Sequence, residues 1–165
     1  MLATRADDTL PRAQAIAAAV VDPEIPVVTI ADLGILRDVV RDGATIVAQL
    51  TPTYTGCPAV LAIELAVEVA LRDAGFDNVR IERVLSPAWS TDAITEDGRR
   101  KLLAYGIAPP SRGRKGTLLF ADDTVACPRC SSNNTSKVSE FGSTACKALW
   151  RCDDCREPFD YFKCI

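Results

Sequence analysis

The sequence of 165 residues contains no histidine. This absence excludes Ser-His-Asp triads, Rieske centres, His-ligated haem, zincin motifs and two-His iron sites. Any chemistry that the chain performs must therefore use thiolates, carboxylates or a borrowed group.

Aromatic residues are also scarce, at 6%, and long apolar runs are missing. The longest apolar stretch, residues 58–71, contains two glutamates and is too short to span a bilayer. The first ten residues show no secretory signal, so we expect a cytoplasmic protein whose thiols stay reduced. An odd count of seven cysteines argues against a closed disulfide framework and favours metal ligands or reactive thiols.

The apolar periodicity predicts an α+β fold for the first two thirds of the chain. Asp42-Gly43 separates two β-rich runs and indicates a hairpin. The helix over 59–74 is expected to bury a wide apolar face that includes Leu61, Leu65 and Val69. The expected helices cover 11–21, 59–74 and 95–105, and the expected strands cover 34–41, 44–50 and 78–85. The order α-β-β-α-β-α predicts a small open-faced sandwich.

The composition changes after the last of these helices. Residues 111–116 are basic and glycine-rich with few apolar side chains, so they are predicted to be a linker. The predicted domains are therefore an α+β domain over 1–110 and a zinc-ribbon-like β domain over 117–165, which opens with a strand at 117–120.

Two C-x-x-C pairs give the strongest signal in the sequence. Cys127 and Cys130 form one pair, Cys152 and Cys155 form the other, and 21 residues separate the pairs. Each pair can wrap a tight turn around one ion, and two such turns supply the tetrahedral S₄ set that zinc accepts. Because such a set leaves no open position, we expect a structural metal site that staples a segment with little core of its own.

Two more thiols, Cys146 and Cys164, lie in the same segment. They are either small buried hydrophobic residues or additional ligands of an iron–sulfur centre, since sulfur-only ligation suits both zinc and iron–sulfur clusters. The spacing of the two pairs favours zinc. A thiol oxidoreductase is less well supported because no thioredoxin-like βαβ context precedes the pairs.

Cys57 is the one cysteine of the α+β part. Pro58 follows it and prefers the first helical position, so Cys57 is predicted to be the N-cap of the helix over 59–74, where a thiolate is favoured. It is a candidate nucleophile or soft-metal ligand, or else a cysteine that only caps. Asp22 and Glu24, fixed by neighbouring prolines, could bind a metal or a partner, or form a plain acidic turn.

Several strings resemble known families. DPEIPVVTI from Asp22, DLGI from Asp32 and TPTYTGCPA from Thr51 resemble the Fe–S cluster assembly domain of SufT-like bacterial proteins and eukaryotic cytosolic Fe–S targeting factors. SPAWSTD from Ser86, YGIAPP, FGSTACKA and EPFDYFKC resemble the PaaD (PaaJ) family, the D subunits of phenylacetyl-CoA epoxidase systems. This second resemblance spans nearly the whole chain.

The resemblance implies a role in aerobic phenylacetate catabolism. It implies a non-catalytic accessory or maturation factor that assists iron or Fe–S cluster assembly of the oxygenase or reductase subunit, with structural zinc and a transient Fe–S cluster as cofactors. By position, Cys57 matches the signature cysteine of the assembly family, and Asp22 and Glu24 match its acidic motif. The alternative is a non-catalytic docking subunit that binds through its zinc ribbon.

The expected partners are the other subunits of that epoxidase system. A homodimer is a further candidate state, and no membrane is expected. Nucleic acid is disfavoured, because acidic residues 153, 154, 157 and 160 interrupt the basic charge of the ribbon.

Overall fold

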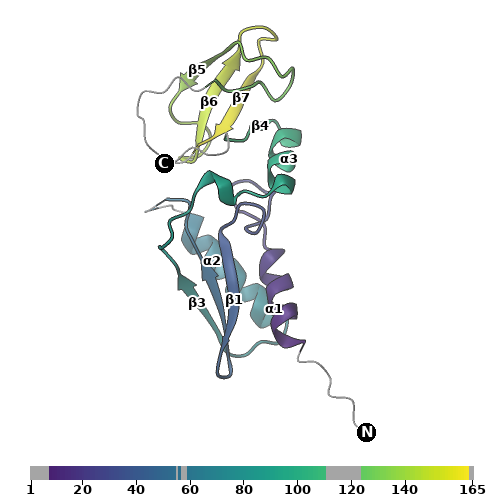
Figure 1. Cartoon of the computed structure of the whole chain (residues 1–165), viewed down its shortest axis with the longest axis vertical. Coiled ribbons are helices and arrows are strands. Elements are labelled where there is room, and N and C mark those ends of the chain that lie inside the picture. Colours follow the sequence, from purple (N-terminus) through teal and green to yellow (C-terminus); the bar gives the residue numbers. More distant parts are fainter. Residues whose placement is uncertain (1–7, 55, 57–58, 111–123, 164–165) are drawn as a thin grey trace. The chain divides into compact units, whose positions relative to one another are not determined.

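The computed structural model describes residues 8–54, 56, 59–110 and 124–163. By contacts within the chain these residues fall into two compact units, Met1–Trp89 and Ser90–Ile165. The predicted α+β class and its element order are confirmed (Figure 1).

The first unit is a three-stranded sheet with two helices. The strands β1 (Leu36–Asp42), β2 (Thr45–Leu50) and β3 (Val79–Arg83) lie side by side in that order (Figure 1). β1 and β2 pair antiparallel through the predicted Asp42-Gly43 hairpin, and β2 and β3 pair parallel. The helix α1 (Thr9–Ala18) packs on β1 and β2, and α2 (Ala59–Asp73) packs on β3 and α1.

The buried side chains of this unit recur along each helix and strand at the spacing that the element requires. Ile46, Ala48 and Leu50 share one face of β2, since side chains alternate along a strand, and Val47 on the other face is buried as well. The side chains that α1, α2 and β2 bury include Ala13, Ala17, Ile46, Ala48, Leu50, Ile63, Val67 and Leu71. Gly75 ends α2 at φ +90°, and the Phe76 N–H donates to the Leu71 carbonyl at 3.1 Å, which closes the helix as a left-handed C-terminal cap.

The prediction that α2 buries a wide apolar face is wrong in part. Leu61, Leu65 and Val69 are 69%, 62% and 46% exposed, whereas Ile63 and Val67 are buried. A sheet of three strands is narrow, and α1 covers part of it, so α2 contacts the core with one stripe only.

The second unit is built on a four-stranded sheet in the order β4-β7-β6-β5. Its strands are β4 (Ile107–Ala108), β5 (Thr135–Ser139), β6 (Lys147–Cys152) and β7 (Pro158–Phe162). β4 pairs parallel with β7, and the other two pairings are antiparallel. The 3₁₀ turn η1 (Thr91–Ala93) and α3 (Glu96–Tyr105) precede β4.

The chain divides into its two units after Trp89, so α3 and β4 belong to the second unit. Ile107 and Ala108 form an edge strand beside β7, which draws α3 into the second unit. The division into domains over 1–110 and 117–165 stays a prediction, and the proposed linker 111–116 and strand 117–120 lie outside the described residues.

Candidate metal centre

Two tight turns of the second unit carry the four cysteines. The first turn, Cys127 to Cys130, precedes β5, and the second, Cys152 to Cys155, connects β6 to β7. The Cys127 N–H donates to the Ser132 carbonyl and the Cys152 N–H donates to the Glu157 carbonyl, each at 2.9 Å. The two turns are therefore closed in the same way, five residues after their first cysteine.

Backbone N–H groups also point at the first sulfur of each turn. Arg129 N–H donates to Cys127 Sγ at 3.4 Å, and Cys155 N–H donates to Cys152 Sγ at 3.5 Å. A metal-bound thiolate accepts such bonds, so the two turns offer the hydrogen bonds that a ligand sulfur uses.

The residue after each turn has left-handed backbone. Ser131 has φ 62° and Arg156 has φ 67°, and these are the non-glycine residues with positive φ in the part of the chain that the structure describes. A left-handed residue with a Cβ costs about 1–2 kcal/mol. Both turns carry a strained residue at the equivalent position. This indicates that the free energy gained by closing each turn outweighs the cost of the strain.

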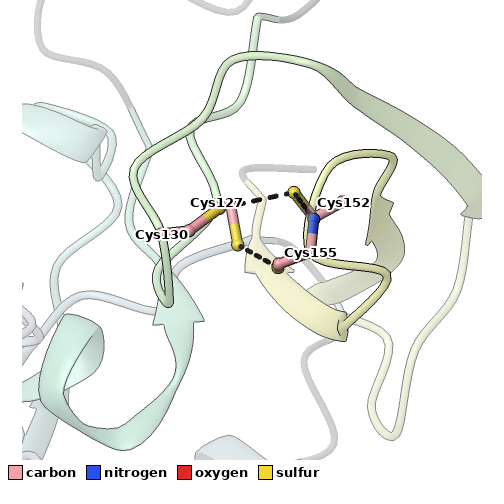
Figure 2. Close-up of side chains that lie close together, drawn as sticks. All are labelled: Cys127, Cys130, Cys152 and Cys155. Atoms are coloured by element: carbon pink, nitrogen blue, oxygen red, sulfur yellow. Dashed lines mark hydrogen bonds between the residues drawn. The ribbon is translucent and has the colours of Figure 1, made fainter.

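The four sulfurs converge on one point. Figure 2 shows the four side chains turned toward one another, with Cys127 Sγ 3.8 Å from Cys155 Sγ and Cys130 Sγ 3.6 Å from Cys152 Sγ. All four ligand atoms lie within 4.8 Å of one another. A tetrahedral zinc ion with Zn–S bonds of about 2.3 Å requires sulfurs about 3.8 Å apart. The separations are far beyond a disulfide bond of about 2.05 Å, so the thiols fit a shared ion instead.

The pKa values of two of the four thiols are shifted in opposite directions. Backbone hydrogen bonds from Cys155 and then Asp154 lower the pKa of the Cys152 thiol to about 7. At Cys155 a backbone hydrogen bond with Glu157 lowers the pKa, but desolvation and the neighbouring sulfurs outweigh it and raise the pKa to about 12. Thiolates at this spacing repel one another, so a divalent ion is what allows all four to be ionised together.

Polar side chains join the two turns independently of the sulfurs. The Asp154 carboxylate accepts hydrogen bonds from the Ser132 hydroxyl and, at 2.8 Å, from Asn134 Nδ2. These two bonds lower the pKa of Asp154. The Asp153 N–H donates to the Asn134 carbonyl at 2.8 Å. The second turn thus fixes the segment that follows the first one, which pre-organises the ligand set.

The further thiols of this segment do not enter the quartet as far as the structure describes them. Cys146 is buried and its sulfur lies 3.1 Å from Thr144 Oγ1, and it is not part of the ligand group found among the described residues. Cys164 lies outside the described residues, so its role as an extra ligand stays a prediction.

In the first unit, Asp22 has a structural task. Its carboxylate Oδ1 accepts the N–H groups of Glu24 and Ile25, each at 2.8 Å, and Asp22 itself is 6% exposed. Glu24 is half-buried. The two carboxylates belong to no group of three or more metal ligands among the described residues.

Cys57 lies outside the described residues, so its place as the N-cap of α2 stays a prediction. Gly56 has φ 91°, a backbone conformation that glycine adopts readily, and Ala59 is the first residue of α2.

Sequence reasoning missed a set of polar contacts around the loops of this unit. The Arg37 Nε donates a hydrogen bond to the Thr51 hydroxyl oxygen, and the Trp89 indole Nε1 donates to the Leu33 carbonyl at 2.7 Å. Thr29 and Asp32 exchange side-chain to backbone hydrogen bonds at 2.9 and 3.0 Å. The T-x-x-D spacing of this last pair could have predicted their contact from the sequence, since it is the pattern of a reciprocal capping box.

The structure defines the class of the chain as a small α+β fold followed by a four-cysteine β ribbon. Residues 14–82 match the family model of iron-sulfur cluster assembly proteins, and residues 111–163 match that of the PaaD zinc beta ribbon domain. A protein of Escherichia coli (strain K12), provisionally named as the D subunit of 1,2-phenylacetyl-CoA epoxidase, is 49% identical over 164 residues, covering 99% of this chain and 98% of that protein. The chain therefore belongs to the family of phenylacetyl-CoA epoxidase D subunits.

Two solved structures are similar to part of the chain. The crystal structure of a domain of unknown function, DUF59, from Bacillus anthracis has a TM-score of 0.52 and 27% identity, covering 58% of this chain and 92% of that chain. A conserved hypothetical protein of Thermotoga maritima is 23% identical with a TM-score of 0.45, covering 62% of this chain and 98% of that chain. In the described part of the chain, every helix is too short or too polar to cross a membrane.

Proposed function

We propose that the chain is a non-catalytic maturation factor for a phenylacetyl-CoA ring epoxidase in the aerobic catabolism of phenylacetate. It acts in the cytoplasm, and it assists iron or Fe–S cluster assembly of the oxygenase or reductase subunit. The observation that carries this proposal is an Fe–S assembly domain within a chain that is 49% identical to an epoxidase D subunit over nearly its whole length.

The residues of the chain support an accessory role over an oxygenase role. Carboxylate-bridged di-iron sites in helical bundles use Glu-x-x-His motifs on facing helices. This chain has no histidine, and its longest helix in the described residues, α2, has 15 residues. The epoxidation itself therefore belongs to another subunit.

The two kinds of cysteine have separate tasks in this proposal. Cys127, Cys130, Cys152 and Cys155 hold a structural zinc ion, which supplies the cross-link that closes the ribbon. Cys57, in the assembly-family loop, carries iron or a cluster transiently. Asp22 and Glu24, in the family's acidic motif, assist this transfer.

A docking role is the second candidate. Val138 and Phe141 are 59% and 62% exposed, and Lys163 Nζ lies 4.3 Å from the centre of the Phe141 ring. Exposed apolar and aromatic side chains of this kind are enriched in protein interfaces. In this alternative the ribbon binds another epoxidase subunit, and Cys57 has no chemical task. A homodimer remains a further prediction for the state of the free chain.

Anaerobic purification tests the transfer proposal directly. The wild-type chain is expected to bind iron and acid-labile sulfide after anaerobic reconstitution, in addition to one zinc ion. The Cys57→Ser variant is expected to keep the zinc and to lose the sulfide and the iron, because a hydroxyl does not replace a thiolate as a soft ligand. Equal iron and sulfide in both proteins would show that Cys57 is not the ligand.

Substitutions at Asp22 separate its structural task from a role in transfer. Asp22→Ala leaves the N–H groups of Glu24 and Ile25 without their acceptor, so we expect a loss of about 1–3 kcal/mol in the free energy of unfolding. Asp22→Asn keeps one oxygen acceptor but removes the charge, so its stability is expected within about 1 kcal/mol of wild type.

Urea unfolding followed by circular dichroism measures both values, and Asp42→Asn, which removes an exposed carboxylate of the same unit outside the acidic motif, is the matched control. If Asp22 assists transfer, the Asn variant folds normally yet binds less iron on reconstitution. An Asn variant with wild-type iron content limits Asp22 to its structural task.

A further inference from the structure

The helix α2 carries a second apolar side that faces solvent. Leu61 and Leu65 are 69% and 62% exposed, and Val69 is 46% exposed. The small residues beside them, Ala62 and Ala66, are exposed as well. These five residues, none of which carries a charge, are called the outer face of α2. Figure 1 shows α2 behind the three strands of its unit, and the structure describes every residue of this helix.

The outer face makes α2 apolar on two nearly opposite sides. The inner side buries Ile63, Val67 and Leu71, and α2 packs there on β3 and α1. A helix with apolar side chains on both sides is normally buried on both. The helix α3 shows the ordinary arrangement, because charged residues, Glu96 and Arg100, are exposed on it. The outer face of α2 therefore has the composition of a surface that another molecule covers.

The two charged residues of α2 between Leu61 and Val69 are paired within the chain. The Glu64 carboxylate accepts hydrogen bonds from Arg83, whose Nη2 lies 2.8 Å from Glu64 Oε2. Arg72 Nε lies 2.9 Å from Glu68 Oε1. The border of the outer face is thus close to neutral, and a charged partner surface gains no new ion pair along it. A second apolar and uncharged helix face is the complement that this border favours.

The outer face also complements itself in shape. Leu61, Leu65 and Val69 recur every four residues and form a ridge, and the small alanines beside them leave a groove. The ridge is nearly symmetric about Leu65, with one aliphatic side chain a turn away on either side. In an antiparallel copy related by a two-fold axis near Leu65, Val69 lies opposite Leu61 and each ridge fits the other groove. A two-fold contact requires a patch that fits itself, which this arrangement supplies.

We propose that the outer face of α2 binds the outer face of a second copy of the chain, as an antiparallel pair of helices. The inference goes beyond the proposed function and does not rest on it. α2 has 15 residues and is about 22 Å long, so the contact is small. Contacts that bury less than about 1,200 Å² in total belong to weak or transient complexes. The pair is therefore expected to form at micromolar concentrations and to dissociate on dilution.

Sedimentation velocity of the zinc-loaded full chain measures the pair, over about a hundredfold range of micromolar concentration. The wild-type chain is expected to pass from monomer to dimer across this range. In Leu65→Glu two carboxylates face each other near the axis, so the dissociation constant is expected to rise by at least about a hundredfold. Leu65→Lys is expected to do the same. Because Leu65 is exposed and the three residue types have similar helix propensities, both variants are expected to fold, which circular dichroism checks.

A mixture of the two variants identifies the contact face. Equal amounts of Leu65→Glu and Leu65→Lys place opposite charges near the axis, so a mixed dimer is expected to form more tightly than either variant pairs with itself. A different tag on each chain distinguishes the mixed dimer from the others. This rescue requires position 65 of one copy to lie near position 65 of the other, and a contact elsewhere on the chain does not produce it.

The matched control is Leu103→Glu, the same substitution at a leucine of α3 that is 44% exposed. It is expected to dimerise as the wild-type chain does. A wild-type chain that stays monomeric throughout the range overturns the proposal and leaves the outer face to a different protein. Wild-type dimerisation in Leu65→Glu, an equal loss in Leu103→Glu, or a mixture that stays monomeric overturns it as well. These measurements involve neither iron nor the epoxidase, so their outcome is independent of whether Cys57→Ser blocks maturation.

Discussion

Replacing Cys152 by serine is expected to release the metal and unfold the ribbon while the first unit stays folded. Cys152 is the last residue of β6, it is fully buried, and its sulfur lies 3.6 Å from Cys130 Sγ. Binding of structural zinc contributes about 10–16 kcal/mol in small metal-folded domains, which is comparable to the total stability of about 5–15 kcal/mol of an ordinary domain. The loss of one ligand therefore removes more stability than the ribbon core can replace.

That core is small, which is the reason for the large effect. The buried cluster of the second unit includes two of the ligands themselves, Cys127 and Cys152, beside aromatic side chains such as Trp150 and Tyr161. The rings of Trp150 and Tyr161 meet edge to face with centres 6.1 Å apart. Because the cluster contains two of the metal ligands, loss of the ion removes the cross-link between the two turns and also disturbs the packing of the cluster.

Two measurements check this prediction in one sample. Metal analysis is expected to fall from one zinc per chain to none, and hydrogen exchange is expected to lose protection in β6 while α2 keeps it. Cys146→Ala, which changes a buried thiol of the same unit outside the quartet, is the matched control and is expected to keep the zinc. A Cys152→Ser protein with full zinc, or a Cys146→Ala protein without it, would contradict the assignment of the four ligands.

Replacing Cys57 by serine is expected to abolish maturation in cells. Serine has nearly the same size as cysteine, but at neutral pH its hydroxyl is not ionised and does not hold iron or a cluster. In a strain that lacks the native chain, the variant is expected to restore neither epoxidase activity nor the iron content of the oxygenase and reductase. Activity at the level of the empty strain is the predicted result.

The control for this experiment is the zinc content of the same variant. Cys57→Ser protein purified from these cells is expected to keep one zinc per chain, which shows that the ribbon is intact. Normal epoxidase activity with Cys57→Ser ends the proposed role of this thiol. If activity is instead lost only in a ribbon variant such as Phe141→Ser, with its zinc retained, the docking alternative is favoured.

Local patterns predicted a large part of the fold. The Asp42-Gly43 hairpin, the end of α2 at Gly75 and the start of α3 near residue 95 depend on residues within a few positions of each other. Turn and cap preferences are local properties, so the sequence alone reports them. The grouping of Cys127, Cys130, Cys152 and Cys155 into one site was also predictable from the sequence. Each C-x-x-C turn is formed by four consecutive residues and is therefore a local feature.

The features that the sequence did not predict depend on packing between distant parts of the chain. The sequence does not show that Leu61 and Leu65 of α2 stay exposed, because the width of the sheet decides how much of a helix is covered. Nor does it show that Ile107 and Ala108 join the ribbon sheet, because a two-residue strand has no periodicity of its own. The Asp22 carboxylate also accepts two backbone N–H groups of its own turn, and its part in iron or cluster transfer stays a prediction.

The sequence by itself determined which chemistry the chain can hold. A chain with seven cysteines and no histidine is limited to sulfur and oxygen ligands, and residue type does not depend on folding. The tertiary structure decided where the sulfurs meet and which side chains brace the loops. The distances between the sulfurs depend on strand pairing across the 21 residues between the cysteine pairs, and this pairing is not written in any short stretch of the chain.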